Sequence, residues 1–333
     1  MNGTVFNCVD AHTCGNPVRV VTSNRPTLEG ATMSEKRQHF LARYDWIRTG
    51  LMFEPRGHDA MSGSILYPPV ESESDLGVLF IEVSGCLPMC GHGTMGTVTV
   101  AIEENLVTPK TPGILKMDAP AGLVQARYSR NGHYVDSVEI RNVPSFIHST
   151  EIAVEVPGLG RLDMDVSYGG NFYAIVEPQA NYRGLDRFTV DDIRRFSPLV
   201  RDAVNRTGEF VHPEDETIRR VSHVMWTDEA RDRTADSRNV VFYGDRGIDR
   251  SPCGTGTSAR VAQLESRGEL EIGQKFVHES IIGSLFTGCA VERTRVGRYS
   301  AIVPTVSGWA RITGHNQISI DERDPYARGF LLM

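Results

Sequence analysis

The sequence contains one short motif twice, and this repeat constrains the fold more than any other feature. Residues 90–94 read Cys-Gly-His-Gly-Thr and residues 253–257 read Cys-Gly-Thr-Gly-Thr, so both copies fit C-G-x-G-T. A proline lies shortly before each copy, and an apolar run with helical character follows each one, at 95–106 and 258–264. Nearly half of the 333 residues separate the copies. The repeat predicts two structurally similar halves, each with one cysteine at the start of a helix.

The length and composition fit a soluble globular chain. At roughly 100–200 residues per domain, 333 residues suggest two domains. Hydrophobic residues make up 40% and charged residues 23%, which excludes a wholly disordered chain. The net charge of -7 argues against a broadly basic face for nucleic acid. The first residues lack the features of a signal peptide, and no uncharged apolar stretch approaches about 18 residues. We therefore expect a cytoplasmic location and no contact with nucleic acid or membrane.

Six cysteines are too few for a disulfide scaffold in a chain of this length. Where thiols stay reduced, a cysteine is either packed in a core or chemically active. We expect Cys8, Cys86 and Cys289 to be core residues. Cys14 lies in a polar, turn-rich segment and is either part of a site or part of a turn. Cys90 and Cys253 are the two expected to be active, because both lie in the repeated motif.

Short apolar runs bounded by Gly, Pro, Asn and Asp predict a chain rich in strands. Helical patterns are fewer: one lies within 27–44, one covers 190–204, and two begin near Thr94 and Thr257. The mixture predicts an α+β fold with little regular βαβ alternation. The strands are expected at 18–21, 77–81, 124–128, 137–140, 172–176 and 239–243.

The repeated motif suits a specific kind of chemistry. A cysteine at a helix N-terminus has its thiolate favoured by the helix dipole, and the free backbone N–H groups there can hold a carboxylate. Two such motifs facing each other would place one thiol on each side of a bound carboxylate. One thiolate could then remove a hydrogen from the adjacent carbon, and the opposite thiol could return a proton to the other face. This arrangement predicts stereoinversion next to a carboxylate.

Two alternative readings of the motif involve other enzyme classes. Residues 91–96 match G-x-G-x-x-G and residues 254–259 match its G/A variant, as in a nicotinamide-dependent oxidoreductase. The acidic residue expected about 20 positions later has no good candidate. Cys253 with His223 or His278 could instead form the dyad of a thiol hydrolase, but that leaves Cys90 without a role.

A metal centre and a pyridoxal phosphate site are the remaining alternatives. Cys86, Cys90 and His92 could bind a metal with His12 or His58, although their spacing matches no common zinc pattern. A pyridoxal phosphate enzyme needs a lysine in a phosphate-binding context, and none of the four lysines has one. We therefore expect no metal and no cofactor.

Several segments resemble the proline racemase family. Residues 89–96 and 249–260 are similar to its two signature segments, and the similarity extends over essentially the whole chain. Within the family, the chain is most similar to a subgroup that epimerises 4-hydroxyproline. Further segments that resemble the family are residues 10–19, 46–55, 54–58, 169–173 and 278–286.

The resemblance implies a diaminopimelate epimerase-like α+β fold. It has two pseudo-symmetric domains, each with a curved sheet around a central helix, and an active site in the interdomain cleft. The implied N-terminal half, with Cys90, is 1–147 plus about 315–333. The implied C-terminal half, with Cys253, is about 148–314. A homodimer is compatible with the family.

The resemblance also implies the reaction. A small amino acid, 4-hydroxyproline, would be epimerised at Cα from the trans-L to the cis-D form by two thiols, Cys90 and Cys253. Relatives that dehydrate trans-3-hydroxy-L-proline carry Thr at the second position, so Cys253 favours inversion. Proline racemisation and reaction on 3-hydroxyproline remain the alternatives. The implied substrate-binding residues are Gly91, His92, His223, Asp249, Gly254 and Thr255.

Overall fold

The computed structural model describes residues 3–332, and the chain divides into two compact units. Unit 1 is Met1–Ile140 together with Gly308–Met333, and unit 2 is Arg141–Ser307. Each unit contains one copy of the C-G-x-G-T motif. Both combine many strands with few helices, which confirms the predicted α+β class.

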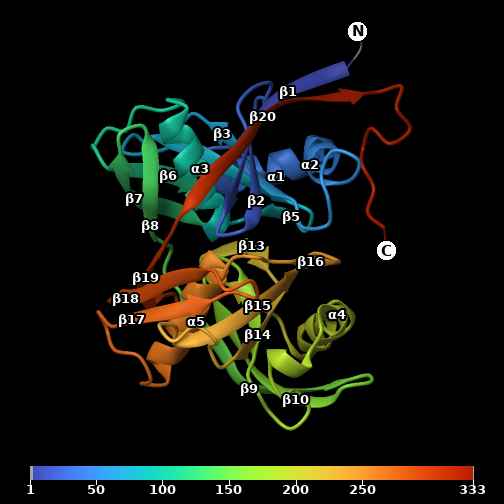
Figure 1. Ribbon diagram of the computed structural model, residues 1–333, viewed down its shortest axis with the longest axis vertical. Helices are drawn as coiled ribbons and strands as arrows, with labels where there is room; N and C mark the ends of the chain where they lie inside the picture. Colours follow the sequence, from blue (N-terminus) through green and yellow to red (C-terminus); the bar gives the residue numbers. More distant parts are fainter. Residues whose placement is uncertain (1–2, 333) are drawn as a thin grey trace. The chain divides into compact units, whose positions relative to one another are not determined.

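Unit 1 is built on a mixed sheet in which the two ends of the chain meet. β1 pairs antiparallel with β2 and with β20, so the first and last strands lie side by side (Figure 1). β2 then pairs parallel with β3, β3 antiparallel with β4, β4 antiparallel with β5 and parallel with β6, and β6 antiparallel with β7. The strands of this unit are β1 (Gly3–Thr13), β2 (Asn16–Val21), β3 (Ser62–Tyr67), β4 (Leu76–Glu82), β5 (Gly85–Leu87), β6 (Ile114–Ala119), β7 (Gly122–Asn131), β8 (Tyr134–Arg141) and β20 (Ala310–Asp321).

Unit 2 repeats these pairings in the same order and with the same directions. β10 pairs antiparallel with β11 and β9, β11 parallel with β14, and β14 antiparallel with β15. β15 pairs antiparallel with β16 and parallel with β17, which pairs antiparallel with β18. The two related halves inferred from the motif are thus present as repeated topology. The strands of this unit are β9 (Phe146–Val156), β10 (Gly160–Tyr168), β11 (Phe172–Val176), β12 (Val211–His212), β13 (Asp215–Arg219), β14 (Val221–Asp228), β15 (Ser237–Tyr243), β16 (Gly247–Ile248), β17 (Lys275–Glu279), β18 (Leu285–Val296) and β19 (Tyr299–Gly308).

One helix lies at the centre of each unit, and it is the helix that follows the motif. α3 (Gly91–Glu103) packs on β1, β2, β3, β7 and β20, and every residue in it is buried. α5 (Gly254–Ser266) packs on β9, β10, β11 and β18, and all but its last two residues are buried. A helix surrounded by sheet needs apolar or small residues on all sides. The Gly-, Thr-, Ala- and Val-rich sequences of both helices meet this need.

Three other α-helices and a 3₁₀ turn cover the sheets from outside. α1 (Met33–Arg43) and α2 (Asp45–Met52) pack against β4 in unit 1, and α4 (Val190–Thr207) packs on β9 and β14 in unit 2. The turn is η1 (Leu185–Arg187). Within residues 3–332, no helix is long and apolar enough to cross a membrane.

The structure differs from the sequence-based expectations in its crossovers. The parallel pairs β2–β3, β4–β6, β11–β14 and β15–β17 are each joined through helices, so βαβ connections are more regular than expected. The helices near Thr94 and Thr257 were expected, but a single sequence does not show that the strands on either side of each helix pair in parallel. α3 also ends at Glu103, earlier than the expected end near residue 106. Asn105 has a φ of 52°, which is not a helical backbone conformation. α2 was not expected.

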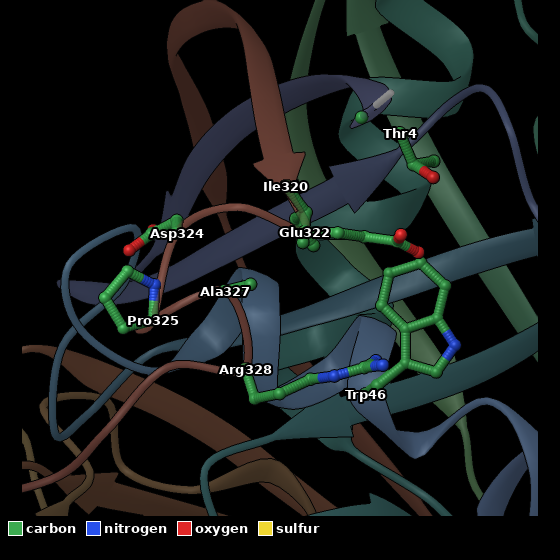
Figure 2. Close-up of a pocket in the computed structure, with 9 residues that line it drawn as sticks. Thr4, Trp46, Ile320, Glu322, Asp324, Pro325, Ala327 and Arg328 are labelled. Carbon is green, nitrogen blue, oxygen red and sulfur yellow. The ribbon is translucent and has the colours of Figure 1, made fainter. Parts of the chain in front are cut away.

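Unit 1 also has an open pocket of about 780 Å³ on its surface. Figure 2 shows Arg328 extending alongside Trp46, and the guanidinium carbon lies 4.9 Å from the ring centroid. Glu322 and Asp324 contribute carboxylates to the rim. Among the described residues that line this pocket, none is a site residue predicted from the sequence.

Candidate active site

Cys90 lies at the N-cap of α3, where its side chain meets the first turn of the helix. Its φ of −140° and ψ of 111° place it in extended backbone. The Gly93 N–H donates to Sγ at 3.3 Å, and the Thr94 side chain donates to the Cys90 carbonyl at 2.8 Å. The sulfur thus takes the place that an N-cap oxygen usually occupies. A thiolate here is stabilised by a backbone donor and by the helix dipole.

Four buried side chains extend this environment into a ring of polar contacts. The Cys90 thiol donates to Glu82 Oε1 at 3.2 Å, and the Ser62 hydroxyl donates to the same oxygen at 3.1 Å. His92 lies with Nδ1 3.5 Å from the sulfur and Nε2 3.1 Å from Ser62 Oγ. The amide nitrogen of Asn16 lies 2.9 Å from the same Nε2. Ser62 and Glu82 are cross-strand partners on β3 and β4, so sheet register brings them together.

This ring can accommodate both protonation states of Cys90. When Asn16 donates to Nε2, the neutral His92 ring carries its proton on Nδ1, where it faces and stabilises a thiolate. When the ring instead donates from Nε2 to Ser62, Nδ1 presents a lone pair to a thiol. Glu82 is the acceptor of the thiol's hydrogen bond in the structure. A residue that alternates between acid and base needs support of this kind in both states.

Cys253 occupies the same topological position at the start of α5, but its backbone differs. Its φ is 64° and its ψ is 107°, a conformation that L-residues rarely adopt. The turn before it is held by Asp249, whose Oδ1 accepts from both the N–H and the hydroxyl of Ser251 at 2.8 Å. The Ser251 hydroxyl in turn accepts from the Cys253 N–H at 3.1 Å. Strain of this kind persists only where surrounding contacts fix it, and it is common at functional sites.

Tyr173 contacts the second thiol from β11. Its hydroxyl lies 3.3 Å from Cys253 Sγ and 2.5 Å from Thr255 Oγ1. His223 is the register partner of Tyr173 across β11 and β14, and their rings lie 4.7 Å apart. The His223 ring also stacks with Tyr243 at 6.2 Å. Cys253, Thr255 and His223 are therefore connected through one tyrosine.

The electrostatic surroundings favour the neutral form of Cys253. Burial raises the pKa of Cys253 well above its usual value, and the neighbouring Asp249 carboxylate raises it further. The Tyr173 hydroxyl and the Gly256 N–H act in the opposite direction, because both donate to a thiolate. Burial also raises the pKa of Tyr173 well above its usual value, so its hydroxyl keeps its proton. Asp249 thus raises the pKa of the Cys253 thiol, and Tyr173 lowers it.

The second glycine of each motif makes room for the cysteine sulfur. A Cβ on Gly93 would lie 2.8 Å from Cys90 Sγ, and a Cβ on Gly256 would lie 3.0 Å from Cys253 Sγ. Both distances are shorter than real carbon contacts. A related constraint holds Gly169 on the loop before β11, where a Cβ would lie 2.2 Å from the Thr255 carbonyl oxygen. The motif therefore needs glycine for space beside its thiol.

The residues predicted from the sequence fall into two groups. In unit 1, Cys90, Gly91 and His92 form the start of α3. In unit 2, Asp249, Cys253, Gly254 and Thr255 surround the start of α5, and Tyr173 links His223 to them.

The sequence analysis missed the groups that contact the thiols from the sheets. Ser62 lies far from Cys90 in sequence and reaches Glu82 through the β3–β4 register, whereas Glu82 is eight residues before Cys90 and lies where β4 turns back into β5. Tyr173 lies in a segment that resembles the family. The apolar pattern of its strand predicts burial, but it does not show that the tyrosine hydroxyl contacts a cysteine sulfur.

The remaining predicted candidates take structural positions. Cys8 and Cys86 are buried core residues with pKa values raised by burial to about 12, as expected of inert thiols. Cys289 is only partly buried, so the expectation that it belongs to the core is wrong. The ring of His278, one proposed dyad partner of Cys253, lies 2.9 Å from Thr257 Oγ1. The possible metal ligands that lie close to His92 are Glu82 and Cys90. Cys86, which was one of the candidate ligands in the sequence, is not part of this cluster.

Comparisons with known proteins agree over the full length of the chain. The family model described as "Proline racemase" matches residues 8–331. A 4-hydroxyproline 2-epimerase from Shewanella loihica is 59% identical over 330 residues, covering 99% of both chains. Another from Ancylobacter novellus is 59% identical over 328 residues and covers 98% of both.

Solved structures show the same relationship. A hydroxyproline epimerase from Agrobacterium vitis, with bound trans-4-hydroxy-L-proline, is 30% identical with a TM-score of 0.90, covering 98% of this chain and 96% of that one. A PhzF-family protein from Bacillus anthracis is 13% identical, with a TM-score of 0.60 over 95% of this chain and 99% of its own, and shares the fold. These structures confirm the diaminopimelate epimerase-like fold. With a duplicated topology, a cysteine at each central helix and this full-length similarity, the chain belongs to the proline racemase family.

Proposed function

We propose that this protein epimerises 4-hydroxyproline at Cα, interconverting trans-4-hydroxy-L-proline and cis-4-hydroxy-D-proline without a cofactor. The observation that carries the proposal is the pair of cysteines, Cys90 and Cys253, at equivalent positions in two units of the same topology. Relatives that are 59% identical over nearly the whole chain are 4-hydroxyproline 2-epimerases. Inversion requires two acid–base groups, and a duplicated fold supplies them.

In the proposed reaction, the two thiols act on opposite faces of the same carbon. One cysteine, as thiolate, takes the Cα proton, and the electron pair of the broken C–H bond delocalises into the substrate carboxylate. The other cysteine, as thiol, delivers its proton to the opposite face and becomes the thiolate. The thiolate takes one proton from the substrate, and the thiol gives one proton to it. After the reaction the first cysteine is the thiol and the second is the thiolate. The reverse reaction uses the same groups in exchanged roles.

The helix N-termini are suited to hold the carboxylate whose charge grows during this step. α3 and α5 both begin with a glycine directly after the cysteine, at Gly91 and Gly254, so backbone N–H groups can approach an anion closely. Partial positive charge at these ends favours the dianionic intermediate more than the substrate. His92 and Thr255 would add side-chain donors at the two helix starts.

Asp249 and His223 are the proposed contacts to the ring. The Asp249 carboxylate is 2% exposed, and a buried carboxylate is well suited to pair with the secondary ammonium of a proline ring. Its contacts with Ser251 fix the carboxylate beside Cys253. His223 stacks with Tyr173 and Tyr243, which fixes its ring as a hydrogen-bonding group for the hydroxyl.

The substrate assignment can be tested in one experiment in heavy water. L-proline, trans-4-hydroxy-L-proline and trans-3-hydroxy-L-proline are incubated in parallel, and deuterium at Cα and the chirality of the product are followed. We expect fast inversion of the 4-hydroxy substrate with one deuterium at Cα. Fast inversion of proline would assign a racemase, and loss of water from the 3-hydroxy substrate would assign a dehydratase.

The two-thiol mechanism is tested by replacing each cysteine alone. Cys90→Ser and Cys253→Ser should each reduce turnover by about 10³-fold or more, because each thiol serves one face. Cys86→Ser is the matched control, since it removes a buried thiol outside the motif. Near-normal epimerisation in both directions by either motif variant would contradict the mechanism.

A further inference from the structure

The surroundings of Cys90 contain the ligand set of a transition-metal site. Glu82, Cys90 and His92 each offer one donor atom, and these atoms all lie within 4.8 Å of one another. Their side chains are only 2–4% exposed. Carboxylate, thiolate and imidazole are the three ligand types that zinc uses in proteins.

The two distances from the Cys90 sulfur are close to those around a tetrahedral ion, and all three donor atoms lie within 4.8 Å of one another. Bond lengths of about 2.3 Å to sulfur and about 2.0–2.1 Å to nitrogen or oxygen give ligand separations of roughly 3.5–3.6 Å. Cys90 Sγ lies 3.5 Å from His92 Nδ1 and 3.2 Å from Glu82 Oε1. Small movements of these side chains would therefore admit an ion at the centre of the triangle.

The groups behind the ligands are also those of a metal site. His92 Nε2 lies 3.1 Å from Ser62 Oγ and 2.9 Å from the Asn16 amide; when this amide turns its oxygen toward Nε2, Nε2 carries the ring proton and the lone pair of Nδ1 faces the sulfur. Ser62 and Ser84 donate to the two oxygens of Glu82 at 3.1 and 3.0 Å. Such contacts hold ligands in place before an ion arrives and increase affinity.

We propose that Glu82, Cys90 and His92 form a reversible inhibitory site for zinc-class divalent cations. Binding replaces the thiol proton of Cys90, which is released to solvent, with a sulfur–metal bond. Three protein ligands leave the fourth position open for water or a substrate carboxylate, as in zinc sites that are not purely structural. The positive end of the α3 dipole opposes the cation, so binding is weaker than at a structural zinc centre.

The consequence of metal binding rests on the proposed function. A metal-bound Cys90 can neither take nor give a proton, so one face of Cα loses its acid–base group. Epimerisation should stop while the fold is retained. A chelator should restore activity, because no covalent bond within the protein changes.

Direct metal binding provides the test and does not depend on turnover. The full-length protein, reduced and freed of metal, is titrated with Zn²⁺ by calorimetry and with Co²⁺ by absorption. We expect one site per chain, with a sulfur-to-cobalt charge-transfer band and the intense visible bands of tetrahedral Co²⁺. Cys90→Ser should abolish the charge-transfer band, and Glu82→Gln should weaken binding by about tenfold or more.

The controls separate this site from other thiols and from the proposed activity. Cys86→Ser and Cys253→Ser should bind Co²⁺ as the unmodified protein does. A charge-transfer band that survives in Cys90→Ser but disappears in either control would overturn the assignment, as would the absence of any band in the unmodified protein. If Glu82→Gln binds as tightly as the unmodified protein, the three-ligand site is also wrong. Epimerisation by the metal-free protein is measured separately, so failure of the proposed function would show as inactivity without any metal.

Discussion

The hydroxyl of Tyr173 lies 3.3 Å from the sulfur of Cys253, and both groups are buried. Because burial raises the pKa of Tyr173 well above its usual value, the hydroxyl stays protonated and can donate to a thiolate. The Asp249 carboxylate acts in the opposite direction and raises the pKa of Cys253. The balance between these two neighbours sets how readily Cys253 acts as a base.

Tyr173→Phe should therefore reduce the fraction of Cys253 that is present as thiolate while leaving the fold intact. Loss of one hydrogen bond to a charged group costs about 1.5–3 kcal/mol, so kcat should fall about 10- to 100-fold. The pH optimum should move upward, because the thiolate loses a donor and the pKa of Cys253 rises further. Steady-state rates across pH, in both directions, measure these effects.

A second buried tyrosine provides the control. The Tyr182 hydroxyl donates to the Thr227 carbonyl at 2.9 Å in unit 2. Tyr182→Phe removes a buried hydroxyl of the same kind, and it should cost about 1 kcal/mol of stability with an unchanged pH optimum. If Tyr173→Phe behaves like Tyr182→Phe, the tyrosine is structural only.

Glu82→Gln should reduce turnover through Cys90. The carboxylate accepts hydrogen bonds from the Cys90 thiol and from Ser62, and an amide of the same shape lacks the charge that strengthens both. We expect kcat to fall about 10- to 100-fold with little change in KM, because Glu82 acts on the thiol rather than on the substrate. Activity within about twofold of the unmodified protein would remove Glu82 from the mechanism.

Glu103→Gln is the matched variant for this test. Glu103 ends α3, is also buried, and accepts from the Val135 N–H at 2.7 Å through Oε1. An amide oxygen can still accept there, so both kcat and KM should stay unchanged. If kcat falls in Glu82→Gln and not in Glu103→Gln, the effect comes from the position of the charge beside Cys90. It does not come from removing a buried carboxylate in general.

The sequence predicted the parts of this site that depend on local order along the chain. The repeated motif placed Cys90 and Cys253 at helix starts, and both helices begin one residue later. The strand expected at 172–176 coincides with β11. These features follow from glycine spacing and from short apolar runs, which are visible in a single sequence.

The contacts to the thiols could not be predicted in the same way. Ser62 reaches the Glu82 carboxylate beside Cys90 because β3 and β4 pair in one register, and a shift by one residue would turn its side chain to the other face. Tyr173 reaches Cys253 because β11 packs against α5, which is another contact between segments far apart in the chain. Pairing between distant strands leaves little trace in one sequence.

Gly93→Ala and Gly256→Ala should both impair catalysis by displacing a sulfur. The added Cβ would lie 2.8 Å from Cys90 Sγ in the first variant and 3.0 Å from Cys253 Sγ in the second. The thiol must rotate or the helix start must shift, and small displacements of a reacting group cost about 10²-fold in rate. Gly208→Ala is the control, because its Cβ meets nothing within 4 Å. Full activity in both motif variants would show that the glycines are not required for space.

The buried histidine His278 should make the protein less stable in mild acid. Burial and, to a smaller extent, the charge of Arg260 lower its pKa to about 3. The unfolded chain protonates this ring near pH 6.5, whereas the folded chain does not, so the unfolded state binds more protons below that pH. The contribution of His278 is therefore complete above about pH 6.5, and it is lost as the pH falls toward about 3.

Urea unfolding at pH 7.5, 6.5, 5.5 and 5.0 measures this dependence. Each pH unit below about 6.5 should cost about 1.4 kcal/mol through His278. His148 and His212, whose pKa values are also lowered by burial, should add to the slope. His278→Asn keeps a polar atom near Thr257 and removes the titrating ring, so the slope should decrease by one proton. His133→Asn, at an exposed position, should leave the slope unchanged. Equal slopes for His278→Asn and the unmodified protein would show that His278 does not resist protonation in the folded state.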